Sequence, residues 1–208
     1  MKILALDSSG LVASVAVVEN DTLLAEYTVN YKKTHSQTLL PMLDEISNMT
    51  ELDLSTIDAI AVAGGPGSFT GLRIGSATAK GLGLALEKPL ISIPTTAAIA
   101  YNIWDTDKFV CPIMDARRNQ VYTGVYCYTD HRLDTVWEQD TMSIEALAEG
   151  LNCLDHEVIF LGDGVAVYRE KLEALLTIPF SFAPAHVNRQ RAAAVGALAE
   201  VYYKEGKI

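Results

Sequence analysis

Short apolar runs alternate with two longer segments of helical periodicity through the first half of the chain. Runs rich in valine, isoleucine, leucine and alanine predict strands at residues 3–7, 13–18, 22–29, 57–63 and 89–94. Leu39, Leu40, Leu43 and Ile46 recur at helical spacing behind Ser36, a residue type that caps helices. Residues 70–86 predict a second helix. The resulting order is typical of a hairpin-built sheet that is extended by right-handed crossovers.

The second half of the chain opens with the same order of elements. It predicts strands at residues 110–114, 120–128, 132–139 and 158–161. It predicts helices at 144–151 behind Ser143, at 165–176, and behind Asn188 as far as Tyr203. Two ribonuclease-H-like topologies in one chain are the plan of the actin, Hsp70 and sugar-kinase superfamily. We therefore expect an α/β fold of two ribonuclease-H-like domains, each a mixed sheet flanked by helices, at residues 1–100 and 101–208, with the last helix able to pack back on the first domain.

A glycine-rich turn, residues 64–71 (GGPGSFTG), joins the strand at 57–63 to the helix at 70–86. Such a turn leaves free backbone N–H groups at the start of a helix, where anions can bind. Neither the Walker P-loop nor the dinucleotide-binding fingerprint fits its glycine spacing. The turn is therefore a candidate anion site without a standard motif.

The helix after this turn carries a stripe of small residues. Gly71, Gly75, Ala79 and Gly83 recur every four residues and so lie on one face. Each interior glycine costs roughly 1 kcal/mol relative to alanine, so the missing side chains must allow another backbone to approach closely. Two interpretations stay open: the stripe packs on the protein's own sheet, or it packs on a partner's helix.

Composition excludes several classes of protein. Half of the 208 residues are apolar and a fifth are charged, which is typical of a globular protein. The longest apolar runs are far shorter than the ~20 residues of a membrane helix, and an acid at Asp7 argues against a secretory signal at the start. Cys111, Cys127 and Cys153 have no metal-ligand spacing, so we expect reduced thiols in a cytoplasmic protein.

The net charge is −10, with only 16 lysines and arginines. Phosphate neutralisation supplies most of the affinity of nucleic-acid-binding proteins, so this chain alone is not expected to bind tRNA directly. The densest basic points are Lys32–Lys33, Arg117–Arg118 and the pair Arg189 and Arg191. A basic protein partner would suit the acidic surface better.

Three groups of residues could hold phosphate. Asp7, Ser8 and Ser9 follow the first predicted strand, where kinases of this superfamily place an acid that works with a metal and a nucleotide. The second interpretation of Asp7 is a carboxylate that accepts hydrogen bonds from N–H groups of the turn. The other two groups are Gly67 and Ser68 of the glycine-rich turn, and Gly162 and Gly164, which also fit an ordinary strand-to-helix turn.

A peptidase is the weakest interpretation of these residues. Ser68, His35 and Asp7 could form a nucleophilic triad, but the strained elbow of hydrolases requires Gly-x-Ser-x-Gly. Here the frame around Ser68 is PGSFT, which lacks the second glycine.

Residues 65–75 (GPGSFTGLRIG) resemble the signature of the bacterial TsaB (YeaZ) family. Residues 3–9, the pair His35 and Ser36 with the segment 39–41, and residues 115–117 also resemble that family. The likeness covers most of the first half of the chain and becomes weak after Tyr128.

This resemblance implies a role in making N6-threonylcarbamoyladenosine in tRNA, at the adenosine beside the anticodon. It implies a non-catalytic subunit without a cofactor: a TsaD-like partner carries the metal and the transfer step, and a TsaE-like ATPase binds the pair. The catalytic relatives carry two metal-binding histidines spaced four apart, and the matching positions here are Thr95 and Ile99. Because neither residue can hold a catalytic metal, we expect no metal site in this chain.

The family resemblance also suggests where the partner docks, on the helix that contains residues 39–46 and on the glycine-striped helix. The free chain could pair with itself through the same face, because a close paralogue uses that surface. The expected interface residues are Leu39, Leu40, Leu43, Ile46, Gly71, Arg73, Gly75, Ala79 and Gly83.

A small ATP-dependent kinase or ATPase of the same superfamily is the alternative function. Asp7, Ser68, Gly162 and Gly164 would then hold phosphate. Nucleotide turnover by the isolated chain distinguishes this alternative from a scaffold.

Overall fold

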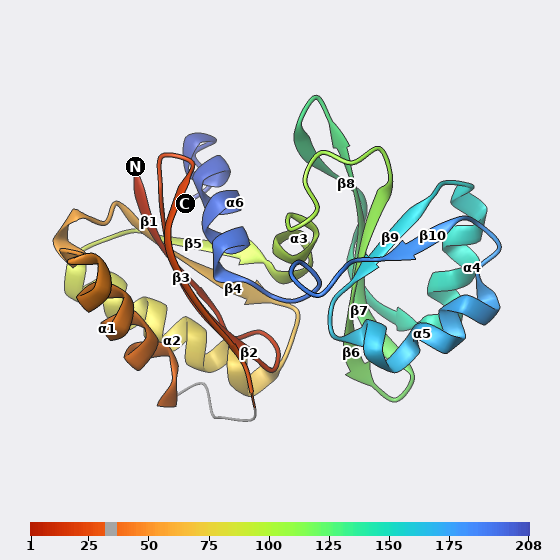
Figure 1. Cartoon of the computed structure of the whole chain (residues 1–208), viewed down its shortest axis with the longest axis horizontal. Coiled ribbons are helices and arrows are strands. Elements are labelled where there is room, and N and C mark those ends of the chain that lie inside the picture. The colour runs from red at the N-terminus through yellow and green to blue at the C-terminus, as the bar shows by residue number, and fades with distance from the viewer. Residues whose placement is uncertain (32–36) are drawn as a thin grey trace. The chain divides into compact units, whose positions relative to one another are not determined.

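The computed structural model describes residues 1–31 and 37–208. Ser36, the expected cap of the first helix, and His35 lie outside the described residues. The chain forms two compact units (Figure 1). Unit 1 combines Met1–Ala98 with Gln190–Ile208, and unit 2 is Ile99–Arg189.

Unit 1 is built on a five-stranded mixed sheet in the order β3-β2-β1-β4-β5. Its strands are β1 (Lys2–Asp7), β2 (Val12–Glu19), β3 (Thr22–Asn30), β4 (Ala59–Gly65) and β5 (Leu90–Pro94). The first three strands pair antiparallel, whereas β4 pairs parallel with β1 and β5. The predicted order of strands and helices in this half of the chain is confirmed.

Helices cover both faces of this sheet (Figure 1). On one face, α1 (Leu39–Thr50) and α2 (Phe69–Leu86) pack over a core that includes Leu4, Leu6 and Val17. A short 3-10 helix, η2 (Leu54–Thr56), precedes β4. Residues alternate between the faces of a strand, so Ala5 points to the other face. There α6 (Ala192–Lys204) packs so closely that a Cβ at Gly196 would lie 2.7 Å from Val18 Cγ2.

The hairpin β2–β3 holds the start of α6. Ser14 Oγ accepts a hydrogen bond from the Ala192 N–H at 2.9 Å, and Glu26 accepts one from the Ala193 N–H at 3.1 Å. The Arg191 Nε also donates to Glu26 at 3.1 Å. The prediction that Asn188 caps this helix is wrong, because the helix begins at Ala192 and its first amides bind side chains of a distant hairpin. These contacts help to group residues 190–208 with unit 1, whereas the sequence predicted a second domain of residues 101–208.

We expect Glu26→Ala to destabilise unit 1 by about 2–3 kcal/mol, because the change leaves a part-buried arginine and a helix N–H without their acceptor. Hydrogen exchange at Ala192 and Ala193 should accelerate more than exchange in β1. Glu19→Ala is the control, since Glu19 forms a surface ion pair with Lys2 and should contribute less than about 1 kcal/mol. Equal losses of unfolding free energy in the two variants would contradict the structural role of Glu26.

Unit 2 has a second five-stranded mixed sheet, in the order β10-β9-β6-β7-β8. Its strands are β6 (Phe109–Arg117), β7 (Gln120–Thr129), β8 (Arg132–Ser143), β9 (Val158–Leu161) and β10 (Phe180–Phe182). Its helices are α4 (Ile144–Leu154) and α5 (Gly164–Leu175), and α3 (Thr95–Ala100) contains the boundary between the units. Ser143 is confirmed as a helix cap, because its Oγ accepts from the Ala146 N–H at 3.1 Å. The sequence did not predict β10, and β8 extends four residues beyond the predicted end at 139.

Three antiparallel hairpins, β2–β3, β6–β7 and β7–β8, have a two-residue turn in which both residues have positive φ. The turns are Asn20–Asp21, Arg118–Asn119 and Asp130–His131. Positive φ at both positions is what tight hairpin turns require, and asparagine, aspartate and glycine are the usual residues there. A left-handed backbone costs roughly 1 kcal/mol or more per residue with a bulky side chain. Arg118, with φ 51°, is therefore an unusual choice, and Arg117 before it also has a positive φ of 65°.

Within the described part of the chain, no helix combines the length and the apolar character needed to cross a membrane.

Candidate functional site

The glycine-rich turn lies between β4 and α2 and is tied to the end of β1. The Ser68 N–H donates to the Ser9 carbonyl at 2.7 Å, and Ser68 Oγ caps α2 by accepting from the Gly71 N–H at 3.4 Å. A Cβ at Gly67 would lie 2.2 Å from the Ser9 oxygen, so only glycine fits this close approach. The glycine spacing of the turn thus serves a contact within unit 1.

Asp7 is completely buried at the end of β1. Its Oδ1 accepts from the Ser9 N–H at 2.9 Å and from the Ser9 hydroxyl at 2.7 Å. Ser8 donates its hydroxyl proton to the Gly71 carbonyl at 2.9 Å. The structure therefore brings Asp7, Ser8, Ser9, Gly67 and Ser68 together, and these hydrogen bonds match the second interpretation, a carboxylate that holds a turn.

These contacts change the electrostatics expected of the turn. The anion site requires free N–H groups at the start of α2. The amides of Ser68 and Gly71 already donate to acceptors of the same unit. The turn is thereby less suited to phosphate than its glycine content suggests.

Gly162 and Gly164 belong to unit 2 and follow β9. A Cβ at Gly162, where φ is +101°, would lie 2.2 Å from the Ile113 carbonyl oxygen, and a Cβ at Gly164 would lie 2.9 Å from it. The Gly162 N–H donates to the Asn188 carbonyl at 3.0 Å, and its own carbonyl accepts from Arg189 at 2.8 Å. Both glycines therefore serve the packing of an ordinary strand-to-helix turn.

The glycine stripe of α2 faces the sheet of unit 1. Gly71, Gly75, Ala79 and Gly83 are all buried. A Cβ at Gly75 would lie 2.5 Å from Ser8 Oγ, and one at Gly83 would lie 2.8 Å from Leu90 Cδ2. Of the two interpretations left open by the sequence, packing on the protein's own sheet is the one that these contacts match. The partner-facing interpretation does not fit these four positions, because their backbone is already covered.

Most of the expected interface residues of α1 are also in the core. Leu39, Leu43 and Ile46 are at most 5% exposed and pack in the cluster over β1 and β2. Leu40 is 53% exposed, and Arg73 on α2 is exposed as well. Helical periodicity identified the apolar face of α1 correctly but could not say what covers it.

The exposed face of α2 carries a second row with the same spacing, of which the sequence predicted only Arg73 as an interface residue. Phe69, Arg73, Ala77 and Gly81 are all exposed, and Leu84 beside them is 84% exposed. The Arg73 guanidinium lies 5.4 Å from the centre of the Phe69 ring. The signal was present in the sequence, since these positions also recur every four residues. We call the exposed residues Phe69, Arg73, Ala77, Gly81 and Leu84 the outer row of α2.

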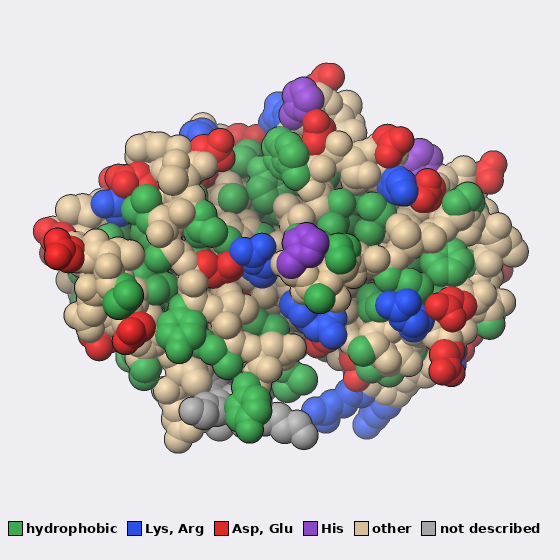
Figure 2. All heavy atoms as spheres, in the orientation of Figure 1, with side chains coloured by type: hydrophobic (Ala, Val, Ile, Leu, Met, Phe, Trp, Pro, Cys, Tyr) green, Lys and Arg blue, Asp and Glu red, His purple; other side chains and the backbone are tan. Residues whose placement is uncertain are grey.

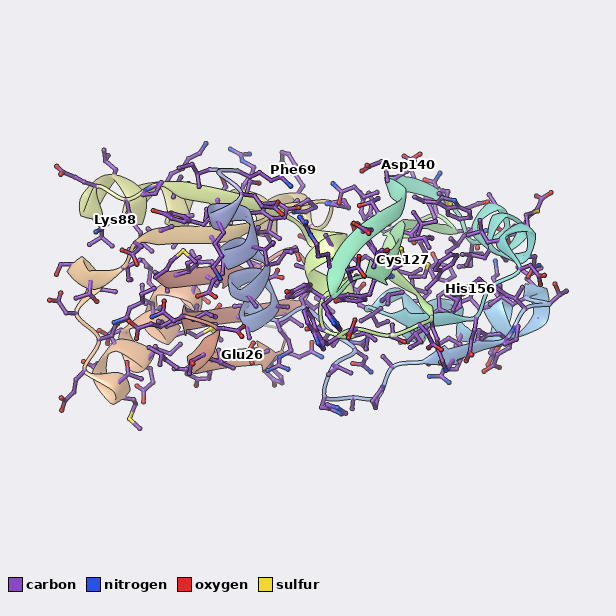
Figure 3. The ribbon with its side chains drawn as sticks, turned by 90° about the horizontal axis from the view of Figure 1, so that it is seen from above. Glu26, Phe69, Lys88, Cys127, Asp140 and His156 are labelled. Atoms are coloured by element: carbon purple, nitrogen blue, oxygen red, sulfur yellow. The ribbon has the colours of Figure 1, made fainter. Side chains whose placement is uncertain are left out.

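A shallow apolar depression lies at the start of the outer row, lined by Phe69, Thr70, Arg73, Ile74 and Ala77. The Phe69 side chain is 74% exposed and lies at the edge of unit 1 in Figure 3. Ala77 and Gly81 have small or no side chains, so another helix could approach this surface closely. An exposed apolar face of this kind often marks an interaction site.

The positions matched to metal ligands of the catalytic relatives serve packing here. Thr95 Oγ1 accepts from the Gly65 N–H at 3.1 Å, and Ile99 is 1% exposed. His131 pairs with Asp105 at 2.6 Å, and His156 Nε2 lies 2.9 Å from the Asp107 carbonyl. Among residues 1–31 and 37–208, no three histidine, cysteine or acidic side chains cluster as metal ligands would.

The family model described as TsaD, a tRNA N6-adenosine threonylcarbamoyltransferase, matches residues 22–207. The tRNA threonylcarbamoyladenosine biosynthesis protein TsaB of Bacillus subtilis is 35% identical over 176 residues, which cover 85% of this chain and 77% of that protein. The chain belongs to the TsaB family. The predicted family resemblance is thus confirmed.

Solved structures agree with this membership of the TsaB family. YeaZ from Pseudomonas aeruginosa is 27% identical and superposes with a TM-score of 0.84, over 99% of this chain and 93% of that one. The polyphosphate/ATP-glucomannokinase of Arthrobacter, at 16% identity and a TM-score of 0.56, is similar in fold alone. Together with the two mixed sheets, these likenesses confirm the predicted fold class.

Proposed function

We propose that this TsaB-family chain is a non-catalytic scaffold subunit in the formation of N6-threonylcarbamoyladenosine in tRNA. It binds and activates a TsaD-like transferase in the cytoplasm and helps to recruit a TsaE-like ATPase. The names of its relatives support the pathway. The outer row of α2 is the observation that supports docking, because it leaves an apolar helix face exposed on a rigid unit.

The docking surface is the outer row rather than the buried stripe. Phe69 and Leu84 supply apolar area, and Arg73 supplies a charge beside an aromatic ring, a residue combination that is enriched at interfaces. Ala77 and Gly81 permit close helix packing. The exposed Leu40 of α1 could extend the same surface. The free chain forms a homodimer through this face when the partner is absent.

Gly81→Leu tests this proposal. A Cβ at Gly81 would meet nothing within 4 Å, so the fold should tolerate leucine. Leucine would hold a partner helix away, and the affinity for the purified TsaD-like subunit should fall tenfold to a hundredfold. The yield of modified tRNA in the reconstituted system should fall with it.

Ala174→Leu on the exposed face of α5 is the matched control and should leave both readouts unchanged. An undiminished affinity of Gly81→Leu for the partner would rule out the outer row as the docking surface. Steady ATP turnover by the isolated wild-type chain would favour the kinase or ATPase alternative instead, but the hydrogen bonds that close the glycine-rich turn argue against that activity.

A further inference from the structure

The turn between β6 and β7 in unit 2 presents two adjacent arginines. Arg117 and Arg118 have φ values of 65° and 51°, and Asn119 follows with 63°. Both arginine side chains are exposed. Glycine or asparagine would fit this backbone with less strain, so the two arginines occupy positions where their side chains are unfavourable to the turn.

The turn is held in place by contacts on both sides. Asp115 Oδ1 accepts from the Arg117 N–H at 2.9 Å and from the Tyr168 hydroxyl at 3.0 Å. Burial raises the pKa of Tyr168 to about 12, so this hydroxyl keeps the proton that it donates. Asn119 donates to Glu145 at 2.7 Å and accepts from Lys171. The two arginines therefore project from an ordered support.

The two arginine side chains are unpaired within the part of the chain that the structure describes. Neither guanidinium has a hydrogen-bond or ion-pair partner among residues 1–31 and 37–208. Several other cations are paired, as in Lys108 with Glu157 and Arg191 with Glu26. In a chain of net charge −10, whose acidic side chains are spread over the face in Figure 2, two consecutive exposed arginines concentrate positive charge on one turn.

We infer that Arg117 and Arg118 contact the phosphate backbone of the tRNA once this chain has bound its TsaD-like partner. The inference rests on the proposed function, which makes tRNA the substrate of the complex. Guanidinium groups bind phosphate oxygens in a bidentate manner, and two neighbouring groups can engage neighbouring phosphates. Two such contacts are too few to overcome the acidic charge of the isolated chain, so tRNA binding requires the partner.

The test is tRNA binding by the reconstituted complex over a range of salt concentrations. Arg117→Asn combined with Arg118→Asn removes both charges and keeps side chains that tolerate positive φ. The affinity for tRNA should fall about tenfold at low salt, and the slope of log affinity against log salt should decrease in magnitude by about 2. The double lysine variant should keep most of the slope, because it keeps the charge.

Lys204→Asn combined with Lys207→Asn is the control for net charge, since it removes two positive charges from exposed positions of unit 1, where Lys207 is paired with Glu205. An equal loss of slope in this control would overturn the inference, because net charge alone would then explain the effect. A weaker affinity of the arginine variant for the TsaD-like subunit, with unchanged tRNA binding by the complex, would also overturn it and indicate a protein contact. If the wild-type complex neither assembles nor modifies tRNA, the proposed function itself fails and the inference fails with it.

Discussion

Gly75→Leu is expected to destabilise unit 1 by about 3 kcal/mol or more, whereas Gly81→Leu on the same helix should leave it as stable or more stable. A Cβ at Gly75 would lie 2.5 Å from Ser8 Oγ and 3.5 Å from Val62 Cγ2, so leucine has no room between α2 and the sheet. It would also displace the Ser8 hydroxyl from the Gly71 carbonyl, to which it donates at 2.9 Å.

Leucine is a better helix former than glycine by somewhat less than 1 kcal/mol, and this gain applies to both positions. The difference between the two variants therefore measures the packing of the stripe on the sheet. Thermal unfolding should show it, with a melting temperature about 6–12 °C lower for Gly75→Leu. Equal stability of the two variants would mean that the stripe does not pack on this sheet. Reduced partner binding by Gly81→Leu alone would separate the docking surface from the core.

Gly162→Ala is expected to destabilise unit 2 by at least about 3 kcal/mol, because two penalties coincide at this position. The backbone has φ +101°, and the added Cβ would lie 2.2 Å from the Ile113 carbonyl oxygen, which is backbone and cannot rotate away. Gly206→Ala is the control for the cost of placing alanine at a position with positive φ. It also has positive φ, at +74°, but a Cβ there would meet nothing within 4 Å, so it should cost only about 1–2 kcal/mol.

The reactivity of the Cys111 thiol gives a local measure of how much Gly162→Ala destabilises unit 2. Cys111 is completely buried in the core of unit 2, and burial raises the pKa of its thiol to about 12. A thiol reagent should therefore modify it only when the unit opens, while the exposed Cys153 reacts at once and serves as an internal reference. Gly162→Ala should increase the rate of Cys111 modification at least a hundredfold if opening limits the reaction. An unchanged rate would show that the turn after β9 can accommodate a side chain and that Gly162 is free for another role.

The local patterns of the sequence determined most of the secondary structure and its order in unit 1. Strand and helix periods reflect the burial of alternate or every third to fourth residue, which a short window of sequence records. The hairpin at Asn20–Asp21 and the capping of α4 by Ser143 also depend on residues close in the chain. These features could be predicted for that reason.

What covers each face was decided only by the tertiary structure. The small residues at 71, 75, 79 and 83 and the outer row share one period, and no local signal says that the first faces the sheet while the second faces solvent. The start of α6 is capped by Ser14 and Glu26, which are 178 and 167 positions away from the amides that they bind. The hydrogen bond from the Ser68 amide to the Ser9 carbonyl also depends on where β1 ends. Sequence alone thus determined which elements form, because their signals are local, and long-range packing decided which of their surfaces remain available for a partner.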